Sequence, residues 1–112
     1  MAKQSYICGL DAAMSVIGGK WKSLILWELR EGTRRFGRLR QALSGVSEKM
    51  LMQQLRELEA DGIVHREVYS QVPPKVEYSL TELGVSLYES VLPLAMWGEE
   101  RMDGIGAARA SA

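Results

Sequence analysis

A chain of 112 residues has room for one domain, because domains typically contain about 100–150 residues. Its hydrophobic fraction of 46% and charged fraction of 25% are ordinary for a globular protein, and its single cysteine, Cys8, excludes an internal disulfide framework or a cysteine-rich zinc site. No apolar run approaches the roughly 18 residues that a membrane span needs, and the first residues lack the apolar segment of a secretion signal. We therefore expect a cytoplasmic protein that does not contact the membrane.

The net charge is zero, but the charges are unevenly distributed along the chain. From Lys20 to Arg66 there are ten lysines and arginines and six acids, whereas from Glu77 to Asp103 six acids accompany one arginine. A basic middle segment facing phosphate groups would explain this pattern. A surface dipole without a partner would look similar, so the charges favour nucleic-acid binding only modestly.

Apolar residues at helical spacing predict four helices in the first half of the chain. After a frayed lead-in over residues 1–7, these helices are expected at Leu10–Ile17, Trp21–Arg30, Phe36–Leu43 and Glu48–Ala60, with a candidate edge strand at Thr33–Arg35. The second helix should be central, with Trp21, Leu24, Ile25 and Leu29 as its core stripe. Ser47 is a good N-cap for the fourth helix, and Gly62 suits the left-handed residue at its other end.

At the start of the second half of the chain, the spacing at which apolar residues recur changes from about 3.6 residues, as in a helix, to about 2 residues, as in a strand. Two strands are predicted at Ile63–Tyr69 and Val76–Leu80, joined by a tip with two prolines. Thr81 should cap a last helix that continues to about Met102, and Pro93 should kink or split it. Residues 103–112 are rich in Gly, Ala and Ser and are predicted to be a disordered tail.

This order of elements is typical of a winged helix-turn-helix domain. We predict a mainly α fold with a small β-hairpin (α+β), in which residues 1–102 form a DNA-binding domain with dimerisation helices at both ends. Two short helices joined by a tight turn and followed directly by a hairpin carry this prediction.

The fourth helix has the pattern of a recognition helix. Leu51, Leu55 and Leu58 form an inward seam, and the opposite side carries Lys49, Gln53 and Arg56. Arginine pairs with guanine through two hydrogen bonds, and glutamine does the same with adenine. Ser47 and the first helical turn would enter the major groove first. Taken alone, an ordinary solvated helix face fits about as well, and the turn before the helix and the hairpin after it favour DNA.

Basic residues flank this helix on both sides. Arg34, Arg35 and Arg38, at the start of the third helix, suit phosphate contacts, although they would also serve as solubilising charges. Arg40 is expected to contact phosphate or to pair with an acid such as Glu57. The hairpin tip, with Gln71 and Lys75, would be a wing that reaches the neighbouring groove or backbone, or a structural hairpin without a partner.

The remaining candidate features concern partners rather than catalysis. The last helix has two apolar stripes, one of Leu83, Leu87, Val91 and Leu94 and another of Val85, Tyr88, Leu92 and Met96, so we expect one to pack on the domain and the other on a second copy. Cys8, at the start of the first helix, is either a reactive thiol or a small buried residue. His65 has no second His or Cys near it in the sequence, so we expect no metal. No catalytic set is visible, and we predict that the protein is not an enzyme.

The chain resembles the HxlR family of winged helix-turn-helix regulators, which is related in architecture to the MarR group. The resemblance runs from about Cys8 to Trp97 and is carried by these motifs: Ile17-Gly18-Gly19-Lys20-Trp21, Arg35-Phe36-Gly37-Arg38-Leu39-Arg40, Val46-Ser47-Glu48-Lys49-Met50-Leu51, Gln54-Leu55-Arg56-Glu57-Leu58, Val72-Pro73-Pro74-Lys75-Val76-Glu77-Tyr78 and Trp97-Gly98. It implies a homodimer formed through the N- and C-terminal helices, operator DNA as ligand and usually no cofactor. Some members sense quinones, aldehydes or hypochlorite through a cysteine at the position of Cys8. In those members a proline commonly follows the cysteine, whereas this chain has Gly9 there.

We therefore expect a repressor or activator that binds a palindromic operator, with a redox or electrophile response through Cys8. Two alternatives remain open at this point. One is a protein-interaction module on the same scaffold, and the other is a regulator gated by a small ligand at the dimer seam near Trp21, Trp27 or Trp97.

Overall fold

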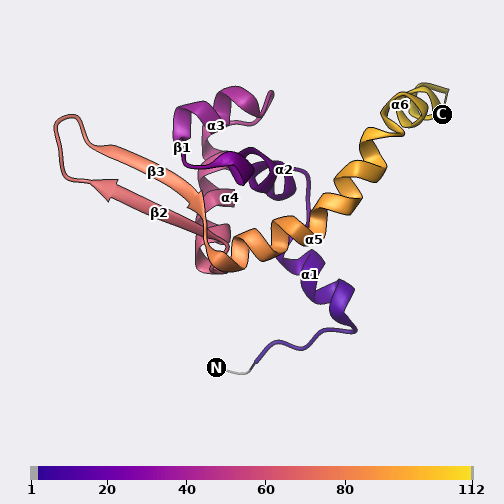
Figure 1. Ribbon diagram of the computed structural model, residues 1–112, viewed down its shortest axis with the longest axis horizontal. Coiled ribbons are helices and arrows are strands. Elements are labelled where there is room, and N and C mark those ends of the chain that lie inside the picture. Colours follow the sequence, from indigo (N-terminus) through magenta and orange to yellow (C-terminus); the bar gives the residue numbers. More distant parts are fainter. Residues whose placement is uncertain (1–2, 112) are drawn as a thin grey trace.

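The computed structural model describes residues 3–111 as a helical domain with a small sheet (Figure 1). Its elements in chain order are α1 (Gly9–Ile17), α2 (Trp21–Glu28), the 3₁₀ helix η1 (Leu29–Glu31), β1 (Arg34–Arg35), α3 (Phe36–Ala42), α4 (Glu48–Ala60), β2 (Val64–Tyr69), β3 (Lys75–Leu80), α5 (Glu82–Glu99) and α6 (Met102–Ser111). Met1 and Ala2 of the expected lead-in and Ala112 of the expected tail lie outside the described residues. The predicted fold class, mainly helical with a small sheet, is confirmed.

Helix α2 lies at the centre of the domain, where it contacts α3, α4 and α5. Its residues Ile25 and Leu26 and the following Leu29 are almost completely buried. The predicted core stripe is only half correct, because Leu24 is exposed and Trp21 is half-buried. Lys22 is buried instead, at the helical position that shares a side with Ile25, Leu26 and Leu29. The helix is therefore turned so that one charged side chain faces the interior.

Helices α3 and α4 form the helix-turn-helix. Gly45 in the turn has a φ of 92°, which glycine adopts without the steric cost of a side chain. Ser47 caps α4 as predicted, because its Oγ accepts a hydrogen bond from the backbone N–H of Met50 at 3.0 Å. The seam of Leu51, Leu55 and Leu58 is buried. This burial holds α4 against the body and leaves its opposite side in solvent.

The sheet has three antiparallel strands in the order β1-β3-β2. The candidate edge strand is confirmed, since Arg34 pairs with Tyr78 and Arg35 with Glu77. In the hairpin, Val64 pairs with Leu80 and Tyr69 with Lys75. Figure 1 shows that β2 and β3 extend away from the helices on the side opposite to α6, as expected of a wing.

A tight junction connects α4, the hairpin and α5. Thr81 Oγ1 donates to the carbonyl oxygen of Gly62 at 2.6 Å and accepts from the backbone N–H of Gly84 at 2.9 Å, which caps α5 as predicted. Gly62 has the expected positive φ of 77°. A Cβ atom on Gly84 would lie only 2.1 Å from the carbonyl oxygen of Ile63, so this position requires glycine. These contacts fix where α5 leaves the domain.

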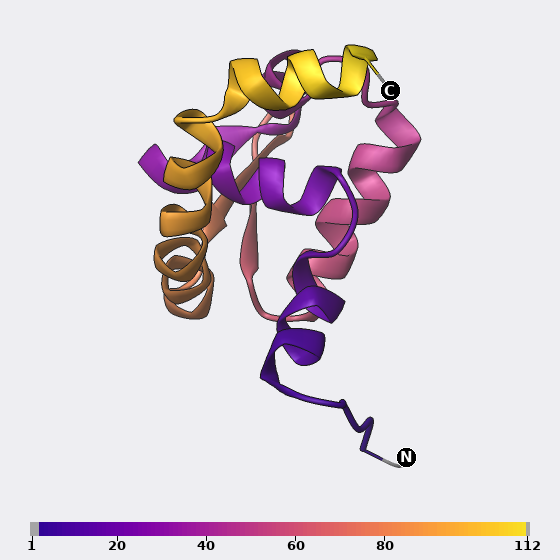
Figure 2. The same ribbon diagram turned by 90° about the vertical axis from the view of Figure 1, so that its right-hand side faces the viewer.

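The C-terminal part of the chain differs from the prediction. Of the two outcomes expected at Pro93, splitting does not occur, because α5 continues through Pro93 to Glu99. The expected disordered tail is also wrong for its described residues, which form α6, an exposed helix at the far end of α5 (Figures 1 and 2). Gly104 and Gly106 lower the helix propensity of this segment, but its alanines have the highest helix propensity of all residues.

Within residues 3–111, no helix is both long and apolar enough to cross a membrane.

Candidate nucleic-acid interface

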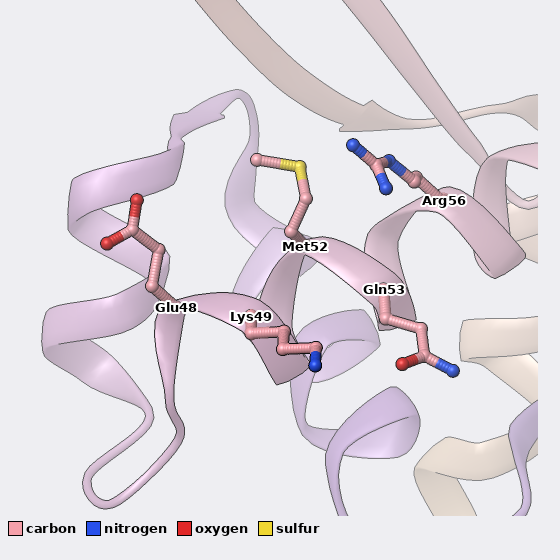
Figure 3. A pocket seen from close by; sticks show the side chains of 5 residues that line it. All are labelled: Glu48, Lys49, Met52, Gln53 and Arg56. Atoms are coloured by element: carbon pink, nitrogen blue, oxygen red, sulfur yellow. The ribbon is translucent and has the colours of Figure 1, made fainter.

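The exposed side of α4 gathers the residues that were predicted to read bases. Lys49, Gln53 and Arg56 are exposed, and with Glu48 and Met52 they line a shallow depression of about 590 Å³. In Figure 3, Lys49 and Gln53 extend to one side of the helix, whereas Met52 and Arg56 point to the side of the wing. The exposed side of α4 therefore presents an ammonium, an amide and a guanidinium along about 10 Å of helix, given a rise of about 1.5 Å per residue.

The arginines before α4 are not equivalent. Arg35 and Arg38 are exposed at the start of α3. Arg34 is half-buried, and its guanidinium already has partners within the chain. Its Nη1 donates to the carbonyl oxygen of Thr33 at 3.0 Å, and its Nη2 lies 4.0 Å from a carboxylate oxygen of Glu31. Arg35 and Arg38 are thus the more available of the three predicted phosphate contacts.

The suggested pairing of Arg40 with Glu57 is wrong. Arg40 Nη1 donates to Glu48 Oε2 at 3.4 Å, across the turn between α3 and α4. Glu57 instead pairs with Lys22, whose Nζ lies 2.7 Å from Glu57 Oε1. The hydrogen bond from Lys22, followed by one from Gln53, lowers the pKa of the Glu57 carboxyl below its usual value of 4.5.

Sequence reasoning missed Lys22, although its position gave a signal. It lies on the side of α2 shared by Ile25, Leu26 and Leu29, where a charged residue needs a partner. That signal predicts an ion pair but does not identify the carboxylate, because Lys22 and Glu57 are 35 residues apart.

The two predicted residues of the wing, Gln71 and Lys75, differ in exposure. Gln71 lies in the exposed tip between β2 and β3. Lys75 is half-buried at the start of β3, with its Nζ 4.4 Å from the ring centre of Tyr69 and 3.9 Å from Glu77 Oε1. The negative charge of the nearby Glu77 carboxylate also raises the pKa of the Tyr69 phenol above its usual value of 10.0. Lys75 is therefore held along the strand, and Gln71 is the freer of the two.

A second hollow of about 530 Å³ lies between α4 and the wing. Arg56 of α4 and Arg66 of β2 both line it, together with Phe36, Glu48, Met52, Leu55, Glu59, Val76 and Tyr78. Arg66 was not among the predicted site residues. Strand alternation places it on the same face as the buried Val64, which is the signal that would have identified it.

The remaining predicted positions lie away from α4. Cys8 is exposed and is the residue directly before α1, where the Ile7 N–H is bonded to Asp11 Oδ2 at 2.9 Å. His65 Nε2 lies 3.3 Å from Glu67 Oε2, and in the part of the chain that the structure describes, no three His, Cys, Asp or Glu side chains are grouped as a metal site.

The two stripes of α5 do not divide as predicted. The residues that pack against the core are Leu87 and Val91 from one stripe and Tyr88 from the other. Leu83, Val85, Leu94, Met96 and Trp97 are exposed. The packed face of α5 thus runs between the stripes, and apolar side chains from both remain in solvent.

Comparison with known proteins assigns the chain to a family. The model described as HxlR-like helix-turn-helix matches residues 16–105. The chain belongs to the HxlR-like helix-turn-helix family. It is 52% identical over 96 residues to the uncharacterized HTH-type transcriptional regulator YybR of Bacillus subtilis (strain 168), a match that covers 86% of this chain and 77% of that protein. This HxlR-like protein is therefore a helix-turn-helix transcriptional regulator and not an enzyme.

Solved structures support the same fold for this HxlR-like chain. It is similar to the redox regulator HypR in its reduced form, with a TM-score of 0.84 and 49% identity, covering 89% of this chain and 99% of that one. Its similarity to the oxidized form of HypR has a TM-score of 0.80 and 53% identity, covering 83% of this chain and 96% of that one.

Proposed function

We propose that this HxlR-like regulator binds an operator sequence as a homodimer, with α4 in the major groove. The observation that carries the proposal is the division of α4 into a buried leucine seam and an exposed side with Lys49, Gln53 and Arg56. An arginine and a glutamine on the free side of such a helix have the geometry to pair with guanine and adenine. Ser47, at the N-terminal end of α4, would lie close to the phosphate backbone.

The flanking basic residues would hold the DNA backbone. Arg35 and Arg38 are exposed where α3 would cross the backbone, and Arg34 would contribute less because it is engaged with Thr33 and Glu31. Gln71 at the wing tip and Lys75 beside it would contact the neighbouring groove or backbone. Binding of chromosomal operators implies a cytoplasmic location.

The apolar side chains of α1 and α5 support a homodimer. Leu10 and Met14 of α1 are exposed, as are Leu94 and Trp97 of α5. Apolar residues gathered on the terminal helices of so small a protein favour burial against another chain. A twofold dimer would present two α4 helices to half-sites roughly 34–36 Å apart, so the operator should be palindromic.

Selection of bound duplexes from a random pool tests this proposal. We expect a palindrome, and we expect affinity to fall with salt at a log–log slope of about 0.9 for each phosphate contacted. If no duplex is retained at low salt, the proposal fails and a protein-interaction module becomes the better description.

We further propose that oxidants or electrophiles act through Cys8. Its thiol is exposed at the end of a terminal helix, and the HypR structures similar to this chain are named as a redox regulator in reduced and oxidized forms. Modification of Cys8 would shift the two recognition helices relative to each other. Cys8→Ser should abolish the effect of oxidant on operator affinity and leave the affinity of the reduced protein unchanged. An unchanged response in Cys8→Ser would rule out this role.

As an alternative to the thiol response, we propose gating by a small ligand bound near Trp27 at the dimer seam. Leu24, Trp27, Ala95, Met96 and Glu99 line a cleft of about 510 Å³ between α2 and α5. Quenching of Trp27 fluorescence by candidate effectors, compared in the wild type and Cys8→Ser, would separate such a ligand from the thiol response.

A further inference from the structure

A chain of three polar side chains connects the interior of the domain to the exposed side of α4. Lys22 of α2 is only 8% exposed, and its Nζ lies 2.7 Å from Glu57 Oε1. The second carboxylate oxygen of Glu57, Oε2, accepts a hydrogen bond from Gln53 Nε2 at 3.1 Å. Gln53 in turn lies on the exposed face, beside Lys49 (Figure 3).

The buried end of this chain fixes its middle. An ammonium group held away from water requires an ionised partner, and removing the partner of a buried charge is strongly destabilising. Lys22 therefore holds Glu57 in place. The same interaction lowers the pKa of the Glu57 carboxyl, so that Glu57 is ionised near neutral pH.

The middle of the chain fixes its exposed end. An ionised carboxylate only accepts hydrogen bonds, whereas a glutamine amide has a donor side and an acceptor side. The amide of Gln53 must therefore turn its NH₂ group toward Glu57. A glutamine without such a neighbour is free to exchange the two sides of its amide.

We propose that Lys22 and Glu57 are positioning residues that set the direction of the Gln53 amide and thereby its base preference. With one N–H directed to Glu57, the carbonyl oxygen Oε1 is left to accept from DNA. The bases with an exocyclic amino group on their major-groove edge are adenine and cytosine, whereas guanine and thymine present acceptors there. This inference rests on the proposed function of α4, and it adds which bases Gln53 selects and why.

Base selection with matched variants tests the inference. Gln53→Ala first identifies the base pair in each half-site that Gln53 reads. Glu57→Gln and Lys22→Met should then reduce the wild-type preference for the selected base at that base pair by about fivefold or more, because one good base contact is worth about tenfold or more. Asp61→Asn is the control, since it removes an exposed carboxylate directly after α4, away from both hollows of the interface, and should leave that preference unchanged.

The outcomes separate the two proposals. If the wild type selects no sequence, the proposed function fails and this inference fails with it. If the wild type selects a palindrome and Glu57→Gln retains every base preference, only the inference is overturned.

A measurement without DNA keeps the inference testable if a variant is unstable. The side-chain amide signals of Gln53 in a ¹⁵N–¹H spectrum are identified by their absence in Gln53→Ala. They should shift in Glu57→Asp, which shortens the carboxylate side chain and retains its charge, and stay in place in Asp61→Asn. Signals that do not move in Glu57→Asp would show that Glu57 does not hold the amide.

Discussion

Arg56 and Arg35 carry the same charge on two different surfaces, so we expect their removal to have different effects. Arg56 lies on the exposed side of α4, and Arg35 lies at the start of α3. Arg56→Ala should remove about 1–3 kcal/mol of discrimination at one base pair and relax the sequence preference there. Arg35→Ala should weaken all duplexes alike and reduce the salt slope by about 1.

Titration of operator and unrelated duplexes at several salt concentrations measures both effects. Arg40→Ala is a useful control, since Arg40 is paired with Glu48 and should contribute less to binding than Arg35. The reverse pattern, with uniform weakening in Arg56→Ala and altered preference in Arg35→Ala, would mean that the two roles are exchanged.

The ion pair between Lys22 and Glu57 should make stability depend on pH in the acidic range. The pKa of the Glu57 carboxyl is lower in the folded state than its usual value of 4.5, chiefly because of the hydrogen bond from Lys22. The stabilisation is therefore present above about pH 4.5 and is lost as the pH falls through the lower folded value. Urea denaturation between pH 7 and pH 3 should show the difference in unfolding free energy between wild type and Glu57→Gln shrinking in that range. A difference that is constant with pH would contradict this assignment.

At the scale of the helix, we expect Ser47 to affect stability and DNA binding separately. Its Oγ caps α4, so Ser47→Ala should lower the unfolding free energy by about 1 kcal/mol. Ser47→Asp keeps a capping oxygen and adds a negative charge that favours a helix N-terminus, so it should retain stability. The same charge would face the DNA backbone, and we expect Ser47→Asp to bind all duplexes more weakly than Ser47→Ala does. Denaturation and duplex titration of both variants measure the two roles, and equal duplex affinity in the two variants would place Ser47 away from the backbone.

The elements that were predicted most closely are those with local signals. The bounds of α4 are as predicted because Ser47, the leucine period and Gly62 mark both ends and the buried side within one segment. Exposed Lys49, Gln53 and Arg56 follow from the same period. Where the buried side depends on another element, the prediction failed, as in the orientation of α2 and the packed face of α5. Apolar residues surround most of both helices, so their sequence alone does not decide which side the rest of the fold covers.

The sequence also did not reveal which residues far apart along the chain contact one another. Lys22 and Glu57 both carry charges that the sequence displays, but the partner of each is set by how α2 packs on α4. Strand alternation places Arg66 on the same face of β2 as Val64, but the hollow that it lines with Arg56 depends on how the wing packs against α4. The exposed residues of α4 in the candidate interface are thus predictable from the sequence. Their partners from other elements, such as Lys22 of α2, are not.

At the scale of the molecule, the interface and the apolar surface lie on different parts of the fold. The wing and α6 extend in opposite directions in Figure 1, and the longest dimension is 51 Å against a shortest of 24 Å. DNA bound at α4 and the wing would therefore leave the exposed apolar side chains of α5 accessible. This separation would allow one surface to bind DNA while the other joins two copies, as proposed above.

A substitution at Leu94 tests whether DNA binding and dimerisation use different surfaces. Leu94 is 64% exposed on α5, so a charged substitution should be tolerated by the monomer and would be costly when buried against a second chain. We expect Leu94→Glu to weaken dimerisation by roughly 30-fold or more, as for a residue at the centre of an interface. Sedimentation should show a shift toward monomer, with Val68→Glu on β2 as the control for an added charge at an exposed valine. Because α4 is untouched, Leu94→Glu should keep its affinity for a single half-site and lose most of its affinity for the full palindrome. A variant that stays dimeric, or a monomer that binds the palindrome as well as the wild type does, would show that α5 does not join the two copies on DNA.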